Sequence, residues 1–156
     1  MIKFKTMKTR KTILTLFTLA ILVAANLNGQ NRKKSATKQQ YPTTYHTAKV
    51  SGLDIFYREA GHKDAPTLLL LHGYPTSSHM VRNLIKDLSA DYHLIAPDYP
   101  GYGRSSQPPM AEFEYSFANF AEIIDELLVQ LKVDRYSLYL MDYGAPVGYR
   151  IFEKHP

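Results

Sequence analysis

Between positions 140 and 148 the chain reads Leu140-Met141-Asp142-Tyr143-Gly144-Ala145-Pro146-Val147-Gly148. The apolar run at 136–141 predicts a buried strand, and residues from about 145 to 154 predict a helix that follows with almost no loop. A turn this sharp between a strand and a helix can push one reactive side chain into a cleft, and its usual form is G-x-S-x-G. Here Asp142 holds the central position, with Leu140 two positions before it and Gly144 two positions after it.

Asp142 has two interpretations. Its carboxylate is predicted at a helix N-terminus, where free N–H groups and the helix dipole keep a negative charge ionised and able to attack carbon. Asp is also a favoured N-cap at ordinary strand-to-helix junctions, so the spacing alone does not exclude a plain cap. The glycines at positions 144 and 148, together with His72-Gly73 upstream, favour the nucleophile.

The 156-residue chain is long enough for a sizeable core and contains no Cys, which excludes disulfides, a Cys nucleophile and thiolate metal sites. Its net charge of +5 belongs entirely to residues 1–29, which carry Lys and Arg but no acidic residue. The other residues carry 14 basic and 14 acidic side chains and are neutral overall. We therefore expect no nucleic-acid partner.

Residues 1–29 have the pattern of a secretory signal peptide, with a basic start and an apolar run at 13–25. That run is shorter than the roughly 20 residues of a membrane-spanning helix. We predict a secreted or periplasmic protein; the alternative is an uncleaved leader that anchors it and makes its only membrane contact. Residues 30–44 are polar without apolar periodicity and predict a disordered linker, which places the folded domain at 45–156.

The predicted domain belongs to the α/β class. Residues 45–50 and 53–60 predict an antiparallel hairpin at a sheet edge. Two further apolar strands are predicted at 67–71 and 92–96, besides the strand that enters residue 142. Amphipathic helices are predicted from Ser77 or Ser78 to Leu88, and from Phe117 to Leu131. Alternating strands and helices imply a mostly parallel sheet with right-handed crossovers and flanking helices.

Three loops leave the carboxyl ends of the predicted parallel strands, at 72–78, 98–106 and 141–145. Ligands of open parallel sheets bind at that edge, so the three loops should converge on one cleft beside Asp142. Backbone donors can face developing charge, which makes the N–H groups of Tyr74 and Tyr143 the candidate oxyanion donors.

Other residues of these loops are expected to support the site. His72 could act as a general base, but a His beside Gly at a strand end more commonly orients its loop by hydrogen bonding. Gly101 and Gly103 should adopt backbone conformations that other residues resist. Phosphate cradling is the weaker alternative, because neither G-x-G-x-x-G nor a P-loop is present. No metal site is expected, since no metal-spaced set is formed by His46, His62, His79, His93 and His155.

Three motifs resemble those of the α/β-hydrolase superfamily, in the right order and spacing. They are His72-Gly73-Tyr74-Pro75-Thr76-Ser77-Ser78, Asp98-Tyr99-Pro100-Gly101-Tyr102-Gly103-Arg104-Ser105 and Asp142-Tyr143-Gly144-Ala145-Pro146-Val147-Gly148. The resemblance covers residues 45–156 and is nearest to the branch with an Asp nucleophile, the epoxide hydrolases and haloalkane dehalogenases. It implies a small-molecule substrate and no cofactor.

In that branch the Asp attacks a substrate carbon and forms a covalent ester, which a His-activated water then hydrolyses while backbone donors hold the oxyanion. Carried over, Asp142 is the nucleophile, and Tyr74 and Tyr143 supply the oxyanion N–H groups. The supporting loop positions are His72, Gly73, Pro75, Asp98, Gly101, Gly103, Gly144 and Gly148.

Two departures bear on the choice within the branch. Similar dehalogenases place Asn after His-Gly and Trp after the Asp to hold the leaving halide, and here these positions are Tyr74 and Tyr143. Epoxide hydrolases often have an aromatic residue after His-Gly, which suits Tyr74, so an epoxide or similar electrophilic carbon is the expected target. Leu140 stands where this turn prefers a small residue and is expected to crowd it.

The resemblance implies only the N-terminal half of the fold. Family members place a lid, further strands, a second acid and the catalytic His beyond the point reached at Pro156. His155 is about 20 Å along the helix from Asp142 at roughly 1.5 Å per residue. We therefore expect the chain to be truncated and to form the ester without turning over. The rivals are a non-catalytic module completed by a second chain and a plain esterase, which the Asp at the turn disfavours.

Overall fold

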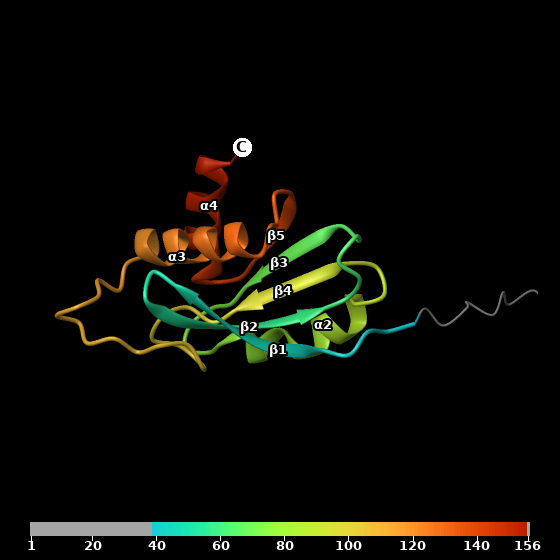
Figure 1. The fold of residues 1–156 in the computed structure, drawn as a ribbon, viewed down its shortest axis with the longest axis horizontal. Helices are drawn as coiled ribbons and strands as arrows, with labels where there is room; N and C mark the ends of the chain where they lie inside the picture. The colour runs from blue at the N-terminus through green and yellow to red at the C-terminus, as the bar shows by residue number, and fades with distance from the viewer. Residues whose placement is uncertain (1–38, 156) are drawn as a thin grey trace, which may run out of the picture. The chain divides into compact units, whose positions relative to one another are not determined.

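The computed structural model describes residues 39–155, which form a five-stranded sheet with helices on both faces (Figure 1). The strands are β1 (Thr44–Val50), β2 (Leu53–Ala60), β3 (Thr67–Leu71), β4 (His93–Pro97) and β5 (Tyr136–Leu140). The helices are η1 (Ser78–Val81), which is a 3-10 helix, α2 (Arg82–Leu88), α3 (Phe117–Gln130) and α4 (Gly144–Lys154). The predicted leader and residues 30–38 of the predicted linker lie outside the described residues.

The strand order β1-β2-β4-β3-β5 confirms the α/β class with an antiparallel hairpin at one edge. β2 pairs antiparallel with β1 and β4, whereas β3 pairs parallel with β4 and β5. The hairpin turns at Ser51 and Gly52, whose φ angles are 46° and 84°. Two consecutive left-handed residues give the two-residue turn whose twist matches the flanking strands.

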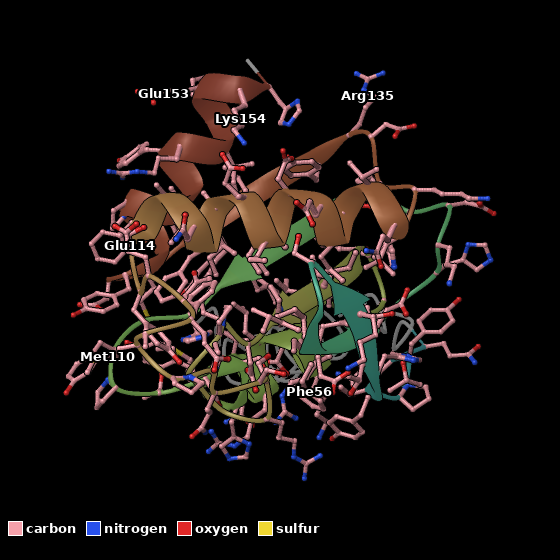
Figure 2. The ribbon with its side chains drawn as sticks, turned by 60° about the vertical axis from the view of Figure 1, so that its left-hand side comes forward. Phe56, Met110, Glu114, Arg135, Glu153 and Lys154 are labelled. Carbon is pink, nitrogen blue, oxygen red and sulfur yellow. The ribbon has the colours of Figure 1, made fainter. Side chains whose placement is uncertain are left out.

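The central strands are buried on both faces because side chains alternate across a sheet. Leu69 and Leu71 face the larger core, which α3 and α4 cover, and Leu70 faces the smaller core under η1 and α2. β4 divides in the same way, with Ile95 in the larger core and Leu94 in the smaller one. The continuous apolar runs therefore predicted these strands correctly. Figure 2 shows α3 along one face of the sheet with α4 beside it.

The prediction that residues 136–141 form a buried strand is wrong in part. β5 ends at Leu140, and its residues alternate between half-buried and exposed. The reason is its place at the edge of the sheet, where it pairs with β3 alone among the described residues. Large apolar side chains are consequently exposed on β5, on α4 and in the turn between them, among them Tyr139 (36%), Phe152 (57%) and Met141 (43%).

Two other boundaries differ from the prediction. The expected disordered linker reached residue 44, but Thr44 begins β1, and the Tyr41 N–H donates to Ser89 Oγ over 2.9 Å. The single helix expected from Ser77 or Ser78 is a 3-10 turn followed by α2. Ser77 caps that turn by accepting a hydrogen bond from the N–H of His79. Within residues 39–155, no helix is long and apolar enough to cross a membrane.

Candidate active site

The three loops predicted to converge leave one edge of the sheet. β4, β3 and β5 are parallel neighbours in that order, so their carboxyl ends point the same way. The loop after β3 contacts the turn after β5 through the hydrogen bond from the Tyr74 N–H to Asp142. The same loop contacts the loop after β4 through the hydrogen bond from the Ser78 N–H to Asp98. These contacts place the three loops around Asp142.

Asp142 lies at the corner between β5 and α4 with a φ of 50°, a left-handed conformation unusual for a residue with a side chain. Its Oδ1 atom accepts hydrogen bonds from the N–H groups of Tyr74 (2.8 Å) and Tyr143 (2.7 Å). These two bonds, in that order, hold the pKa of the Asp142 carboxyl below its ordinary value, so the side chain is ionised near neutral pH. The residue is exposed, and no described residue donates to its Oδ2 atom.

The alternative that Asp142 is a plain helix cap does not describe this geometry. The N-cap of α4 is Tyr143, and no side chain of the described residues caps the helix. Asp142 instead joins its own turn to a loop 68 residues earlier in the chain. Oδ1 thus accepts one long-range and one local backbone bond, and no described residue donates to Oδ2.

Close backbone packing holds this corner and explains its glycines. A Cβ atom at Gly73 would lie 2.6 Å from Asp142 Cβ, and one at Gly144 would lie 2.5 Å from the carbonyl oxygen of Leu71. Both distances are shorter than non-bonded contacts allow. At Gly148 the nearest atom is Leu140 Cδ2, 2.2 Å from the ideal Cβ position. Leu140 therefore does not crowd the turn, because Gly148 leaves room for its side chain.

His72 is fully buried, and both of its ring nitrogens have partners. Nε2 accepts a hydrogen bond from the Tyr99 N–H (3.2 Å), so the proton must lie on Nδ1, which donates to the carbonyl oxygen of Gly73 (3.0 Å). Burial lowers the pKa of His72 below its ordinary value. This neutral ring, with a hydrogen bond at each nitrogen, supports the loop and has no nitrogen available to deprotonate water. Pro75 follows Tyr74 in the same loop through a cis peptide bond.

Asp98 organises the loop after β4. Its buried carboxylate accepts from the N–H groups of Ser78 (2.7 Å) and Arg104 (2.9 Å). A Cβ at Gly103 would lie 2.0 Å from Asp98 Oδ2, and the φ angles of Gly101 and Gly103 are 83° and 54°. Both glycines thus adopt the left-handed backbone that the sequence led us to expect.

Two residues of this loop were not identified from the sequence. The buried Ser105 hydroxyl donates to the Asp98 carbonyl oxygen (2.7 Å) and accepts from the Phe56 N–H (3.0 Å), which ties the loop to β2. Tyr102 lies near the site: burial raises the pKa of its phenol, and the charges of Tyr143, Tyr74 and Asp142 raise it further. The Gly-Tyr-Gly spacing pointed to Tyr102, but only its glycines were interpreted.

Aromatic residues cluster beside the turn that carries Asp142, and two of them, Tyr74 and Tyr143, donate their backbone N–H groups to it. The ring centroids of Tyr74 and Tyr143 lie 5.4 Å apart with a tilt of 34°, and Phe117 meets Tyr143 edge-on at 5.0 Å. Tyr102 lies with its ring 5.4 Å from that of His72. The surroundings of Asp142 are thus apolar faces with phenol groups at their edges. Such surroundings suit a small, weakly polar molecule.

The His and acidic side chains of the described residues do not gather into a metal site. Within residues 39–155, no group of three or more His, Asp or Glu side chains is arranged to hold a metal ion. His93 Nε2 lies 2.7 Å from Glu59 Oε1 at the opposite end of β4. His155 bonds to Asp125 Oδ1 over 2.8 Å at the far end of α4.

Residues 66–156 match the family model of the alpha/beta hydrolase fold. The chain belongs to the α/β-hydrolase fold family. It is similar to an uncharacterized hydrolase of Saccharomyces cerevisiae, with 45% identity over 113 residues, and to a haloalkane dehalogenase of Bradyrhizobium diazoefficiens, with 38% identity over 109 residues. These alignments cover 72% and 70% of this α/β-hydrolase chain but only 38% and 34% of the relatives.

Solved structures of similar hydrolases also match this chain over part of their length. A haloalkane dehalogenase variant from Bradyrhizobium elkanii matches this α/β-hydrolase chain with a TM-score of 0.69 and 35% identity, over 73% of this chain and 37% of that one. The epoxide hydrolase CorEH matches with a TM-score of 0.67 and 30% identity, over 72% of this chain and 38% of that one. The chain therefore spans a little over a third of the length of these relatives.

Proposed function

We propose that this protein is a hydrolase that attacks an epoxide, or a similar electrophilic carbon, through Asp142. One observation carries the proposal. The Asp142 carboxylate is exposed at a strand–helix corner while two backbone N–H groups from different loops hold its Oδ1 atom. An ionised carboxylate with one oxygen fixed and the other free is arranged for attack by the free oxygen.

In the first step, Oδ2 of Asp142 forms a bond to the substrate carbon and the epoxide C–O bond breaks. The electron pair of that bond moves to the oxygen, which takes a proton from solvent or a nearby phenol. The product is a hydroxyalkyl ester of Asp142. Its carbonyl oxygen is Oδ1, which already accepts from the Tyr74 and Tyr143 N–H groups.

In the second step, water attacks the ester carbonyl carbon and negative charge develops on Oδ1. The two N–H groups that already contact this atom would stabilise that charge without moving. The bond from the carbonyl carbon to the ester oxygen then breaks, so the diol leaves with the former Oδ2 and the oxygen of the water remains in the carboxylate. The attacking water must also lose a proton to a base. Among residues 39–155, the His that lies next to this site is His72, and both of its nitrogens have partners. We therefore propose that the described residues perform ester formation and that the base is supplied from outside them.

The haloalkane dehalogenases among the relatives support a second candidate, in which Asp142 displaces a halide. The ester chemistry would be the same, and no proton would be needed by the leaving group. Halide stabilisation is less well supported, because Tyr74 and Tyr143 occupy the positions where similar dehalogenases carry Asn and Trp. We place the epoxide first for this reason.

A substrate panel separates these proposals. The purified parent chain and its Asp142→Asn variant are each incubated separately with an aryl epoxide, a bromoalkane and a phenyl ester. The moles of product formed per mole of protein are then measured. We expect at most about one equivalent of epoxide opened, with none for the variant. Halide release without epoxide opening would favour the second candidate. Multiple turnovers that Asp142→Asn abolishes would contradict the proposed lack of a base.

We also propose that the free edge of β5 is where the remainder of a hydrolase fold pairs with this chain, in one polypeptide or as a second chain. Within residues 39–155, β5 pairs with β3 alone, so its outer edge has unpaired backbone groups that favour another strand. Exposed apolar side chains flank it, including Tyr139 and Met141 beside β5 and Tyr149 and Phe152 on α4. Size-exclusion chromatography tests the second-chain form, because a discrete complex supports it and a monomer contradicts it.

A further inference from the structure

A hollow of about 510 Å³ lies on the side of the molecule where α2 covers the sheet. Its walls come from the segment before β1, from Arg58 on β2, and from Arg82 and Lys86 on α2. The segment is held in place by the hydrogen bond from the Tyr41 N–H to Ser89 Oγ. None of the residues around Asp142 lines this hollow.

The charged side chains around the hollow are all positive. Among the described residues that line it, three side chains are cationic and none is acidic. Arg82 and Lys86 are four residues apart on α2, where like charges on one helix face repel each other. Within residues 39–155, no carboxylate forms an ion pair with Arg58, Arg82 or Lys86. Their positive charge is therefore left uncompensated by the described protein.

The guanidinium groups are nevertheless held in position by neutral partners. Arg58 Nε donates to Ser78 Oγ over 3.0 Å, and its guanidinium lies 5.0 Å from the centre of the Tyr45 ring. Arg82 donates to the carbonyl oxygen of His79 over 3.1 Å. These contacts fix the direction of the side chains without neutralising them. A fixed, uncompensated group of cations is the arrangement that binds an oxyanion.

We propose that this hollow binds a phosphate group carried by a small molecule or by a lipid head group. Phosphate offers several acceptor oxygens, which match the donors of Arg58, Arg82 and Lys86. The volume exceeds what a bare phosphate needs, and the exposed ring of Tyr45 provides a surface for the rest of the ligand. The proposal is independent of the chemistry at Asp142, because the two sites share no residue.

The test is a calorimetric titration of the full chain with inorganic phosphate at constant ionic strength, using chloride as the reference salt. Arg82→Gln with Lys86→Gln removes two cations and keeps good helix formers on α2. We expect this double variant to weaken phosphate binding by at least about tenfold, since a hydrogen bond to a charged group is worth that much. Asp142→Asn should bind phosphate as the parent chain does.

The matched control is Arg150→Gln with Lys154→Gln, which removes an Arg and a Lys four residues apart on α4. Arg150 contacts the carbonyl oxygen of Pro146, and Lys154, labelled in Figure 2, pairs with Glu122. This control changes the net charge equally and should leave phosphate binding unchanged. Equal loss in both double variants would show a non-specific charge effect and would overturn the proposal.

A second arm distinguishes the source of the phosphate. Vesicles of phosphatidylglycerol and of phosphatidylcholine are compared in a sedimentation assay with the same variants. The hollow is assigned to a lipid head group if the chain binds phosphatidylglycerol vesicles but not phosphatidylcholine vesicles, and if that binding requires Arg82 and Lys86. Binding of inorganic phosphate without binding of vesicles assigns it to a soluble phosphorylated ligand. Absence of both, or binding that the α2 variant leaves intact, overturns the proposal.

Discussion

Replacing Gly148 by Ala tests how the corner below Asp142 is packed. An ideal Cβ at this position lies 2.2 Å from Leu140 Cδ2 and 3.3 Å from Leu71 Cδ1. Overpacking of this kind costs about 1–3 kcal/mol. Ala also favours a helix interior over Gly by roughly 0.5–1 kcal/mol. We therefore expect Gly148→Ala to lower the free energy of unfolding by about 1–2 kcal/mol.

The sign of this effect should depend on residue 140. Leu140→Val lacks the δ carbons that would meet the new methyl group most closely. In that background the remaining tight contact is with Leu71 Cδ1 at 3.3 Å, and we expect the helix preference of Ala to outweigh it. Gly148→Ala should then raise the free energy of unfolding by about 0.5–1 kcal/mol. The coupling between the two positions is expected to be about 1.5–3 kcal/mol, at the upper end of values for residues in contact.

Urea unfolding followed by far-UV circular dichroism measures all four variants of this cycle. Gly144→Ala is the control, because its Cβ would meet the backbone oxygen of Leu71 at 2.5 Å, which no side-chain change relieves. It should destabilise equally with Leu or Val at position 140. If Gly148→Ala destabilised by the same amount in both backgrounds, the packing described for Leu140 would be refuted.

Three further predictions follow from the site. Asp98→Ala leaves the buried N–H groups of Ser78 and Arg104 without an acceptor and should lower the free energy of unfolding by about 2–4 kcal/mol in the same urea assay. Burial lowers the pKa of His72, so the unfolded chain binds a proton at this residue more readily than the folded chain does. The contribution of His72 to the free energy of unfolding should be fully present above the unfolded pKa of 6.5 and should be lost as the pH falls below it. His72→Gln should flatten that part of the pH profile. Because two N–H groups lower the pKa of Asp142, its rate of ester formation should begin to fall only below the ordinary Asp pKa of 3.8, and a half-maximal rate at or above that pH would contradict the assigned hydrogen bonds.

Much of the fold was predictable because it depends on local patterns. The runs of Leu in β3 and the apolar stripe of α3 are dictated by burial, and Gly101 and Gly103 by backbone conformation. The order of the strands and helices then placed the loops that surround Asp142 at one edge of the sheet.

The remainder depended on contacts between distant residues. The exposure of β5 follows from its place at the edge of the described sheet, where β3 is its one neighbour, and its own apolar sequence does not reveal that place. Leu140 fits the corner because Gly148, eight residues later, lacks a side chain. Serine is common in loops, so the sequence did not distinguish Ser105. Only the folded chain shows that its hydroxyl links the Asp98 carbonyl oxygen to the Phe56 N–H on β2.

The central claim is that Asp142 is the nucleophile, and peptide mass spectrometry after incubation with an aryl epoxide tests it most directly. We expect one adduct with the mass of the intact epoxide, located on the carboxylate of Asp142. That adduct should be absent from Asp142→Asn and present in the surface control Asp134→Asn. An adduct on another residue, or the same labelling in Asp142→Asn, would contradict the account.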